Sequence, residues 1–444
     1  MIISTPQTDD RLRMRLSRLT QRDEDYWSFK DSRREHGHGL FQYPAMMVPQ
    51  VARAVLREAC KVHPKIDSVG DPFAGSGTIL TESMFKGLAF TGTDINPLAI
   101  LLCRVKAGPF FVEALDEKAT DILAQIDEDS RWALEVNFPN RDKWFEKDVL
   151  ISLSRIRRAI VSEGSAWARR FFWICLADTV RLTSNSRTST FKLHIRPAEQ
   201  IEQRDANPIA VFRKAVTRNL QHMKDAAERL ANEGYLNRGH YLGEVNIVLG
   251  DTRRIEPAGL CDIILTSPSY GDNATTVPYG QYSYLPLQWM ELSDIDPHID
   301  ADTLRSTCEI DSRSLGGSKR VSAVERESLV DRSRSLKRYL ERLRNQPPDR
   351  AKRVIAFFRD LDACFPAVLR SLRPGGLMAW TLGNRKVGGK RVPLDTILSE
   401  LLENHNAQLL LKMRRKISSK RMAPKNSVAE TMSSESILVM RKAA

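Results

Sequence analysis

Short apolar runs alternate with amphipathic stretches in separate parts of the chain, a pattern that predicts strands followed by helices. In the first part, apolar residues recur with helical spacing from Val51, and a strand is predicted over 65–70. A helix over 78–86 and a second strand over 88–93 follow directly. This βαβ succession predicts a parallel sheet with a right-handed crossover.

The same alternation resumes later in the chain. Apolar runs over 245–249 and 261–264 predict two more strands, and a helix is predicted over 354–372 after a further interruption. Residues 373–376, Arg-Pro-Gly-Gly, predict a turn before the next strand. The remaining predicted elements are a strand over 377–382, a helix over 394–403 and closing strands over 407–412 and 436–440.

Two long interruptions separate these sheet-forming parts. Residues 108–244 are mostly helical by period and predict an inserted subdomain. The second interruption covers 291–350, and the stretch 311–353 carries thirteen Lys and Arg against six Asp and Glu. The predicted organisation is an N-terminal arm (1–40), a first sheet segment (41–107), a helical insertion (108–244), a second sheet segment (245–290), a basic insertion (291–350) and a final sheet segment (351–444).

Composition narrows the class of protein. The 444 residues carry a formal net charge of +13, which favours a polyanionic partner such as nucleic acid, although a solvated basic surface is the plainer alternative. The six cysteines are scattered without a Cys-x-x-Cys pair and predict reduced thiols, neither a zinc site nor a disulfide framework. No apolar run approaches 18 residues, so we expect no transmembrane helix, and the reduced thiols favour a cytoplasmic protein.

A glycine-rich turn, Asp71-Pro-Phe-Ala-Gly-Ser-Gly-Thr78, stands where the first predicted strand gives way to a helix. Gly75 and Gly77 allow a tight turn and close approach of the backbone to a ligand, and the following helix N-terminus attracts an anionic group. A nucleoside-triphosphate loop would have a lysine after the last glycine, but Thr78 stands there, which disfavours that class.

Two further acids follow later strands. Asp94 lies 23 residues after Asp71, at the end of the second strand, where a carboxylate can accept both hydroxyls of a ribose. A helix N-cap before Pro97 is the alternative role for Asp94. Asp251, after the next strand, could accept a hydrogen bond from an adenine amino group. Together the three acids mark the sheet edge at which doubly wound folds bind ligands.

The most informative segment is Thr266-Ser267-Pro268-Ser269-Tyr270, which follows the buried strand that begins at Cys261. A small hydroxyl, a proline with an exposed carbonyl and an aromatic ring are suited to gripping a planar base by its amino group. A plain turn leaving a sheet is the alternative reading of the same five residues.

These motifs resemble those of the amino-methyltransferases that modify exocyclic amines of DNA bases with S-adenosylmethionine, and most closely the cytosine-N4 branch. The family loop Asp-Pro-Phe-x-Gly-Ser-Gly-Thr is matched at every fixed position, and Thr/Ser-Ser-Pro-Pro-Tyr is matched except at Ser269. The resemblance implies a doubly wound, seven-stranded class I (Rossmann-like) α/β sheet with two insertions. The cofactor-binding residues it implies are Tyr43, Pro44, Asp71, Phe73, Gly75, Gly77, Thr78, Asp94, Ile95 and Asp251.

The resemblance also implies how catalysis works. Ser267 and the Pro268 carbonyl would accept hydrogen bonds from the amine, and Tyr270 would stack on a base flipped out of the duplex, with no metal required. Ser269 replaces the second proline of the family and removes a rigid φ angle from the loop. In this family, a serine at the position of Ser267 tends to accompany methylation of cytosine N4, whereas Asp or Asn tends to accompany methylation of adenine N6.

The partner implied is double-stranded DNA, with a cognate restriction endonuclease as a possible second partner. Adenine-N6 methylation, an RNA substrate and a catalytically silent nucleic-acid-binding module remain alternatives. The helical insertion is the first choice for reading the target sequence. Basic residues proposed to contact nucleic acid are Arg187, Lys192, Arg414, Arg415, Lys416, Lys420 and Arg421, with a solvated surface as the alternative.

Overall fold

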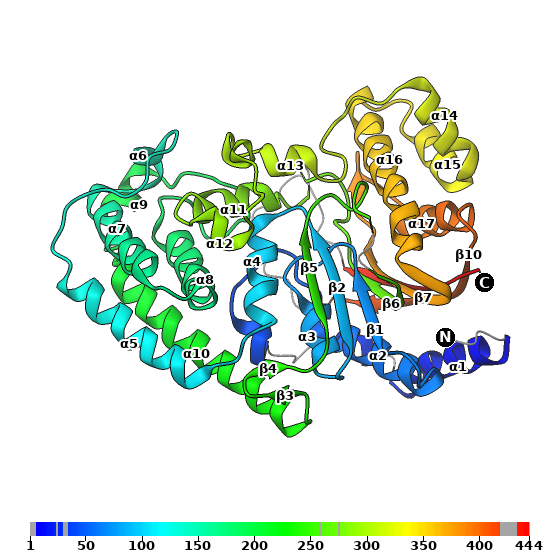
Figure 1. Cartoon of the computed structure of the whole chain (residues 1–444). Helices are drawn as coiled ribbons and strands as arrows, with labels where there is room; N and C mark the ends of the chain where they lie inside the picture. Colours follow the sequence, from blue (N-terminus) through cyan, green and yellow to red (C-terminus); the bar gives the residue numbers. More distant parts are fainter. Residues whose placement is uncertain are drawn as a thin grey trace.

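A computed structural model describes residues 6–23, 25–29, 34–256, 259–273, 276–417 and 433–443. One seven-stranded sheet organises the molecule, with strands in the order β10-β11-β7-β6-β1-β2-β5 (Figure 1). Its strands are β1 (Ser68–Asp71), β2 (Ala89–Asp94), β5 (Val245–Leu249), β6 (Cys261–Thr266), β7 (Leu372–Gly383), β10 (Ala407–Lys416) and β11 (Ser434–Lys442). The strand order therefore reverses beside β1, between β1 and β6.

Five neighbouring strands, β5, β2, β1, β6 and β7, pair in parallel. Only β11 runs the other way, because it pairs antiparallel with both β7 and β10. The carboxyl ends of β1, β2, β5 and β6 consequently meet at one edge of the sheet, and the end of β10 lies at that same edge. This arrangement confirms the predicted doubly wound, seven-stranded fold.

Both faces of the sheet are covered, because successive side chains of a strand point to opposite faces. Ile263 and Leu265 belong to one buried cluster, whereas Ile264 between them belongs to the other. The first cluster lies under α2 (Pro49–Val62), α3 (Thr78–Met84) and α4 (Pro97–Lys106), and the second under α16 (Pro348–Arg370) and α17 (Leu394–Glu403).

The long helical region beside β5 extends the first of these cores instead of forming a core of its own (Figure 1). Its central helix is α8, which is buried along most of its length and packs against α4, α7, α10 and α11. The helices of this region are α5 (Val112–Glu128), α6 (Arg141–Trp144), α7 (Lys147–Ser162), α8 (Ala166–Thr183), α9 (Ala198–Glu202) and α10 (Pro208–Asn232), followed by the hairpin β3 (Leu236–Asn237) and β4 (His240–Tyr241).

A second group of helices leads from β6 to α16. Its first helix contacts α4 and α8, and its last two helices pack on α16 and α17. A capping box between Ser322 and Glu325 sets the start of α14. The elements are α11 (Tyr279–Leu287), α12 (Leu292–Ile295), η3 (Ala301–Leu304), α13 (Glu309–Arg313), α14 (Ala323–Arg332) and α15 (Arg334–Arg342).

The Arg-Pro-Gly-Gly segment differs from its prediction. Instead of a turn before the strand, residues 373–376 lie inside β7, where the pairing with β6 jumps from Leu372 to Leu377. Gly375 adopts a φ of 68°, which a glycine tolerates without strain and which accommodates the extra residues as an irregularity in the ladder.

The N-terminal region packs on the sheet domain. Helix α1 (Pro6–Arg22) contacts α2 and β10, and the short 3₁₀ helix η1 (Tyr26–Ser28) lies against β10, while a second, η2 (His36–Gly39), contacts α10. Beyond β7, a small hairpin of β8 (Lys386–Val387) and β9 (Lys390–Arg391) precedes α17. No helix in the described ranges is long and apolar enough to cross a membrane.

Candidate active site

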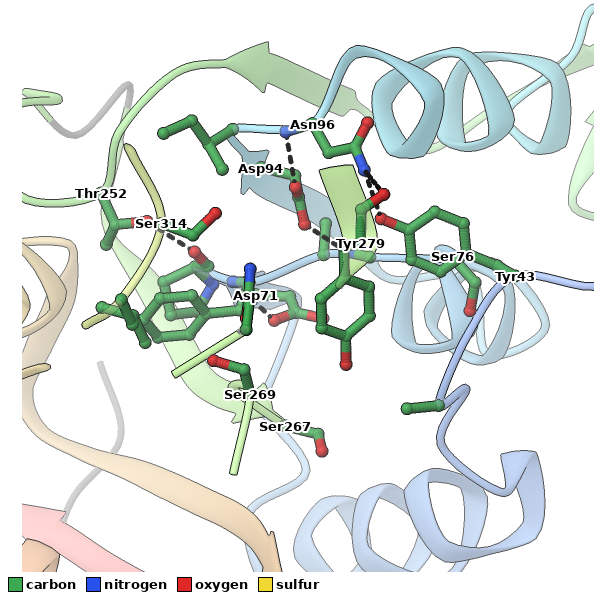
Figure 2. Close-up of a pocket in the computed structure, with 18 of the residues that line it drawn as sticks. Tyr43, Asp71, Ser76, Asp94, Asn96, Thr252, Ser267, Ser269, Tyr279 and Ser314 are labelled. Carbon is green, nitrogen blue, oxygen red and sulfur yellow. Dashed lines mark hydrogen bonds between the residues drawn. The ribbon is translucent and has the colours of Figure 1, made fainter. Parts of the chain in front are cut away.

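A cavity opens at the carboxyl edge of the sheet, where β1, β2, β5 and β6 end (Figure 2). Its empty volume is about 980 Å³ with the open solvent at its mouth included. The predicted site residues that line it are Tyr43, Pro44, Asp71, Phe73, Gly75, Thr78, Asp94, Ile95, Asp251 and Ser267. The cavity thus brings both sequence motifs to one place.

The glycine loop owes its shape to two left-handed residues. Gly75 has a φ of 49° and Gly77 a φ of 68°, and Gly77 is the N-cap of α3. A Cβ on Gly77 would come within 3.0 Å of Cys103 Sγ, so close packing as well as φ requires glycine there. Gly77 does not itself line the cavity but supports the loop from behind. Lys106, buried on α4, donates from Nζ to the Ser76 carbonyl at 2.6 Å.

Asp71 links the two motifs. Its carboxyl group is buried and accepts hydrogen bonds from Thr266 Oγ1 at 2.7 Å and from the Phe73 backbone N–H at 3.1 Å. Burial raises the pKa of Asp71 to about 7, against the smaller lowering effect of these two hydrogen bonds. Thr266 therefore fixes the end of β6 to the end of β1.

Asp94 holds the glycine loop from the next strand. One of its oxygens accepts from the Gly75 N–H at 2.8 Å and the other from the Asn96 N–H at 2.8 Å. Burial raises the pKa of Asp94, while the backbone donors lower it. Each oxygen retains a second lone pair, so the carboxylate can still accept from a ligand in the cavity.

Asn96 and Tyr279 are site residues that sequence reasoning missed. Asn96 Nδ2 donates to Tyr43 Oη at 3.0 Å and to Ser283 Oγ at 2.8 Å, which joins the segment before α2 to α11. The rings of Tyr43 and Tyr279 stack with centroids 5.8 Å apart. Figure 2 places both rings on one side of the cavity, opposite Thr252 and Ser314. The asparagine two residues after Asp94 was the available signal.

The loop after β6 presents hydroxyl groups to the cavity. Ser267 and Ser269 both line it and lie on the side of Asp71 that faces away from Asn96 (Figure 2). Pro268 between them is buried and is not a lining residue. Tyr270 lies behind Ser267, and its hydroxyl contacts Ser267 Oγ at 3.3 Å and donates to Glu435 at 3.0 Å.

Asp251 lies at the opposite end of the cavity and is already paired. Arg253 contacts both of its carboxylate oxygens, one at 2.6 Å from Nη2, and also reaches Asp360 at 3.2 Å. The neighbouring wall was missed by sequence reasoning. It comes from α13 and the residues after it, with Ile310, Arg313, Ser314 and Leu315 lining the cavity beside Cys364 of α16.

A second missed pair supports the loop after β6 from that wall. Asp311 accepts from Asn273 Nδ2 at 3.0 Å and from the backbone N–H groups of Gly280 and Gln281 at 2.8 and 3.1 Å. Asn273 lines the cavity, and its Oδ1 has no hydrogen-bond partner among the described residues. No sequence motif marks either residue.

The basic residues proposed to contact nucleic acid separate into three groups. Arg187 is exposed and Lys192 half-buried on the loop after α8, which packs against α11 through Phe191 and Tyr282. Arg414 and Lys416 are exposed near the end of β10, at the carboxyl edge of the sheet. Lys420 and Arg421 lie outside the described residues.

Arg415 departs from that expectation. Because side chains alternate along a strand, it points inward between Arg414 and Lys416, and it is buried. Its guanidinium donates to Glu435 at 2.5 Å and to the Trp27 carbonyl at 2.9 Å. Arg415 therefore joins the sheet to the N-terminal region and is not presented to a partner.

Three features define the class of S-adenosylmethionine-dependent methyltransferases: the antiparallel strand β11, the glycine loop after β1 and the acid Asp94 at the end of β2. The cavity fits that cofactor, because the Asp94 carboxylate still has lone pairs that can accept from a ligand. Next to it, Gly75 has no side chain to keep a ligand away from the backbone. In the described part of the chain, no group of three or more His, Cys, Asp or Glu side chains is arranged to hold a metal ion.

Comparison with known proteins identifies the family within this class. The type II methyltransferase M.MvaI of Kocuria varians is 33% identical over 451 residues, which cover 98% of this chain and 97% of that protein. The type II methyltransferase M.MjaII of Methanocaldococcus jannaschii is 32% identical over 99 residues, 22% of this chain and 18% of that protein. The chain belongs to the type II DNA methyltransferases.

Other comparisons add little. No protein-family model matches the chain. The rRNA methyltransferase aviRa of Streptomyces viridochromogenes aligns over 90% of this chain and 86% of its own with 11% identity and a TM-score of 0.31. A SAM-dependent methyltransferase of Methanosarcina mazei aligns over 85% and 93% with 9% identity and a TM-score of 0.27. Scores this low support no argument about this chain.

Proposed function

We propose that this protein methylates the exocyclic N4 amine of cytosine at a specific sequence in duplex DNA, as the modification enzyme of a restriction–modification system. The observation that carries the proposal is the position of Ser267, whose side chain lines the same cavity as Asp94 and the glycine loop. A base admitted to this cavity would meet a hydroxyl acceptor next to the cofactor.

The chemistry needs an acceptor at that point. The lone pair of an exocyclic cytosine amine is delocalised into the ring, so the amine is a poor nucleophile. Hydrogen bonds from its N–H groups to Ser267 Oγ and to the Pro268 carbonyl would localise the lone pair on nitrogen. S-adenosylmethionine supplies the electrophilic methyl group when it is bound, and the protein contributes positioning and electrostatic stabilisation.

The residues that would hold the cofactor lie along the opposite wall. Asp94 would accept from the ribose hydroxyls, and the loop at Gly75 would let the backbone approach the ligand. The stacked Tyr43 and Tyr279 would flank the end of the cavity near Asn96. Asp251 would contact the adenine amino group only by sharing its carboxylate with Arg253.

Target reading is proposed for the helical region of residues 108–244. Its loop between α8 and α9 lies against α11, which follows the catalytic loop directly, and the Leu193 N–H donates to Gln281 at 3.4 Å. Arg187, exposed on this loop, would reach phosphates or base edges of a duplex whose flipped base enters the cavity.

Methyl transfer with labelled S-adenosylmethionine tests the proposal directly. Duplex DNA, single-stranded DNA and duplex RNA are offered to the wild-type protein, and the product is digested to nucleosides. We expect label in N4-methylcytosine from duplex DNA, and methylome sequencing of cells expressing the protein should show one recurrent target sequence. Label in N6-methyladenine, or in RNA alone, would overturn the proposal. Cofactor binding without transfer would indicate a silent nucleic-acid-binding module.

The role of Ser267 has its own test. Ser267→Ala removes the hydroxyl acceptor, and we expect kcat to fall about 10- to 100-fold because one hydrogen bond to the reacting amine is lost. Single-turnover transfer to duplex DNA measures the change. Ser328→Ala, an exposed serine on α14, is the matched control and should retain full activity. Equal activity of the two variants would contradict the assigned role.

A further inference from the structure

A chain of hydrogen bonds runs from the catalytic loop into the closing strands of the sheet. Ser267 Oγ lies 3.3 Å from Tyr270 Oη, and Tyr270 Oη donates to Glu435 Oε1 at 3.0 Å. Arg415 donates to the other oxygen, Glu435 Oε2, at 2.5 Å. Glu435 lies at the start of β11, 165 residues beyond Tyr270, and belongs to no motif.

The direction of each hydrogen bond in this chain follows from the carboxylate. A glutamate carboxylate only accepts, and this one is paired with the buried guanidinium of Arg415. The single hydroxyl hydrogen of Tyr270 must therefore point at Glu435. The Tyr270 oxygen can then only accept, so Ser267 donates its hydroxyl hydrogen to Tyr270. The lone pairs of Ser267 Oγ are left free to accept from another group.

This direction is the one that the reaction requires. A serine whose hydrogen points into the cavity would repel the N–H groups of a base, whereas a serine that donates to Tyr270 offers them its lone pairs. Resting on the proposed function, we infer that Glu435 is a positioning residue, which sets the donor–acceptor direction through Tyr270 so that Ser267 acts as the acceptor for the substrate amine.

The surroundings of Glu435 suit this role. It stands directly across the β10–β11 pair from Arg415, and the Arg415 guanidinium is also held by the Trp27 carbonyl. The side chain of Glu435 is 14% exposed and that of Arg415 is 4% exposed. One oxygen of the Glu435 carboxylate is thus held by the buried Arg415, and the other accepts from Tyr270.

Glu435→Gln tests the inference because it keeps the shape of the side chain but changes the donor–acceptor direction of the hydrogen bonds. The amide would accept from Arg415 through its oxygen and donate to Tyr270 through its nitrogen, which reverses the chain and turns the Ser267 hydrogen into the cavity. We expect kcat to fall about tenfold or more, while the KM values for S-adenosylmethionine and DNA change less than about twofold.

Two further variants separate positioning from a structural effect. Glu400→Gln is the matched control, since Glu400 on α17 also accepts from hydroxyls, those of Ser333 and Ser335, but lies away from the cavity. It should keep kcat. Tyr270→Phe keeps the ring and breaks the chain, and it should lower kcat by a similar factor to Glu435→Gln. Adding Glu435→Gln to Tyr270→Phe should then cost less than about twofold more.

The outcomes distinguish this inference from the function on which it rests. Wild-type protein that fails to methylate duplex DNA would overturn the proposed function. Wild-type protein that is active while Glu435→Gln keeps its kcat, or shows a loss that adds fully to that of Tyr270→Phe, would overturn only the role of Glu435. If Glu435→Gln does not fold, Tyr270→Phe decides alone, because an unchanged kcat in that variant excludes the chain.

Discussion

In the glycine loop after β1, the Gly75 N–H is held by a carboxylate of the same βαβ unit, whereas the loop after β6 depends on side chains from distant parts of the chain. Asp94 binds the Gly75 N–H across only 19 residues. Tyr270 reaches Glu435 across 165 residues, and Asn273 reaches Asp311 across 38. The comparison teaches that the acid that holds the glycine loop is close in sequence, although Thr252 also reaches the Pro72 carbonyl from 180 residues away. The loop after β6 is supported by the more distant Glu435 and by Asp311.

The two sides also differ in where charge is buried. On the cofactor side, burial raises the pKa of Asp71 to about 7, which favours its neutral form below that pH. On the catalytic side, the Glu435 carboxylate is paired with the buried Arg415 guanidinium. Substitutions on the two sides should therefore differ in what they change: stability and cofactor affinity on the first, turnover on the second.

The largest expected effect concerns Asp71 and is a change in stability with pH. With a folded-state pKa of about 7, above the 3.8 of an exposed carboxyl, Asp71 stabilises the fold fully below pH 3.8, and this contribution is lost as the pH rises through 7. Asp71→Asn does not titrate and can still accept from Thr266. Its stability relative to wild type should rise by about 2–4 kcal/mol between pH 4 and pH 8.

Urea unfolding of the cofactor-free protein at the two pH values measures this change. Asp395→Asn is a useful contrast, because burial alone would raise the pKa of that carboxyl but its partners Lys412 and Ser436 lower it. The stability that Asp395 contributes is therefore retained from pH 8 down to about 3.8 and is lost only at lower pH, so Asp395→Asn should show almost no change between pH 4 and pH 8. A difference for Asp71→Asn that is constant with pH would show that Asp71 is charged in the folded protein throughout.

A smaller effect is expected at Asp94 and bears on the cofactor. Asp94→Ala removes a carboxylate that holds the Gly75 N–H and that we propose for the ribose hydroxyls, so the Kd for S-adenosylmethionine should rise about a hundredfold. Ser267→Ala should leave the same Kd within about twofold. Isothermal titration of both variants sharpens the comparison, and equal losses of cofactor affinity would contradict the division into two sides.

Sequence reasoning reached the local side of the site more fully than the other. Asp71, Gly75, Gly77 and Asp94 follow strand ends, and a left-handed glycine or a strand-end acid leaves a readable pattern. Glu435 and Asp311 leave none, because their partners are brought near only by the folded sheet and by the helices after β6. The spacing of apolar residues predicted the sheet strands well. It predicted a turn over 373–376 before the strand, however, whereas these residues form an irregularity inside β7.

Arg415 shows where a signal existed and was not used. Within β10, alternate residues face inward, and Met413 is buried, so the residue two positions later is expected to be buried as well. Treating 414–416 as one basic cluster ignored this period. The three neighbouring cations therefore have two different environments, a buried one that supports Glu435 and an exposed one at the carboxyl edge of the sheet.

The smallest predicted effect tests that exposed environment. Arg414→Ala removes one positive charge near the end of β10, and if this edge contacts DNA phosphates, affinity should fall about threefold and the slope of log K against log salt should decrease by about 0.9. Lys65→Ala is the matched control, since Lys65 is exposed before β1, at the opposite edge of the sheet. Fluorescence anisotropy with duplex DNA at several salt concentrations measures both. Equal losses of DNA affinity in the two variants would mean that net charge, and not a contact at the carboxyl edge, accounts for the effect. A loss confined to Arg414→Ala would instead place the duplex against that edge, where Arg415 supports Glu435 and, through it, the catalytic loop.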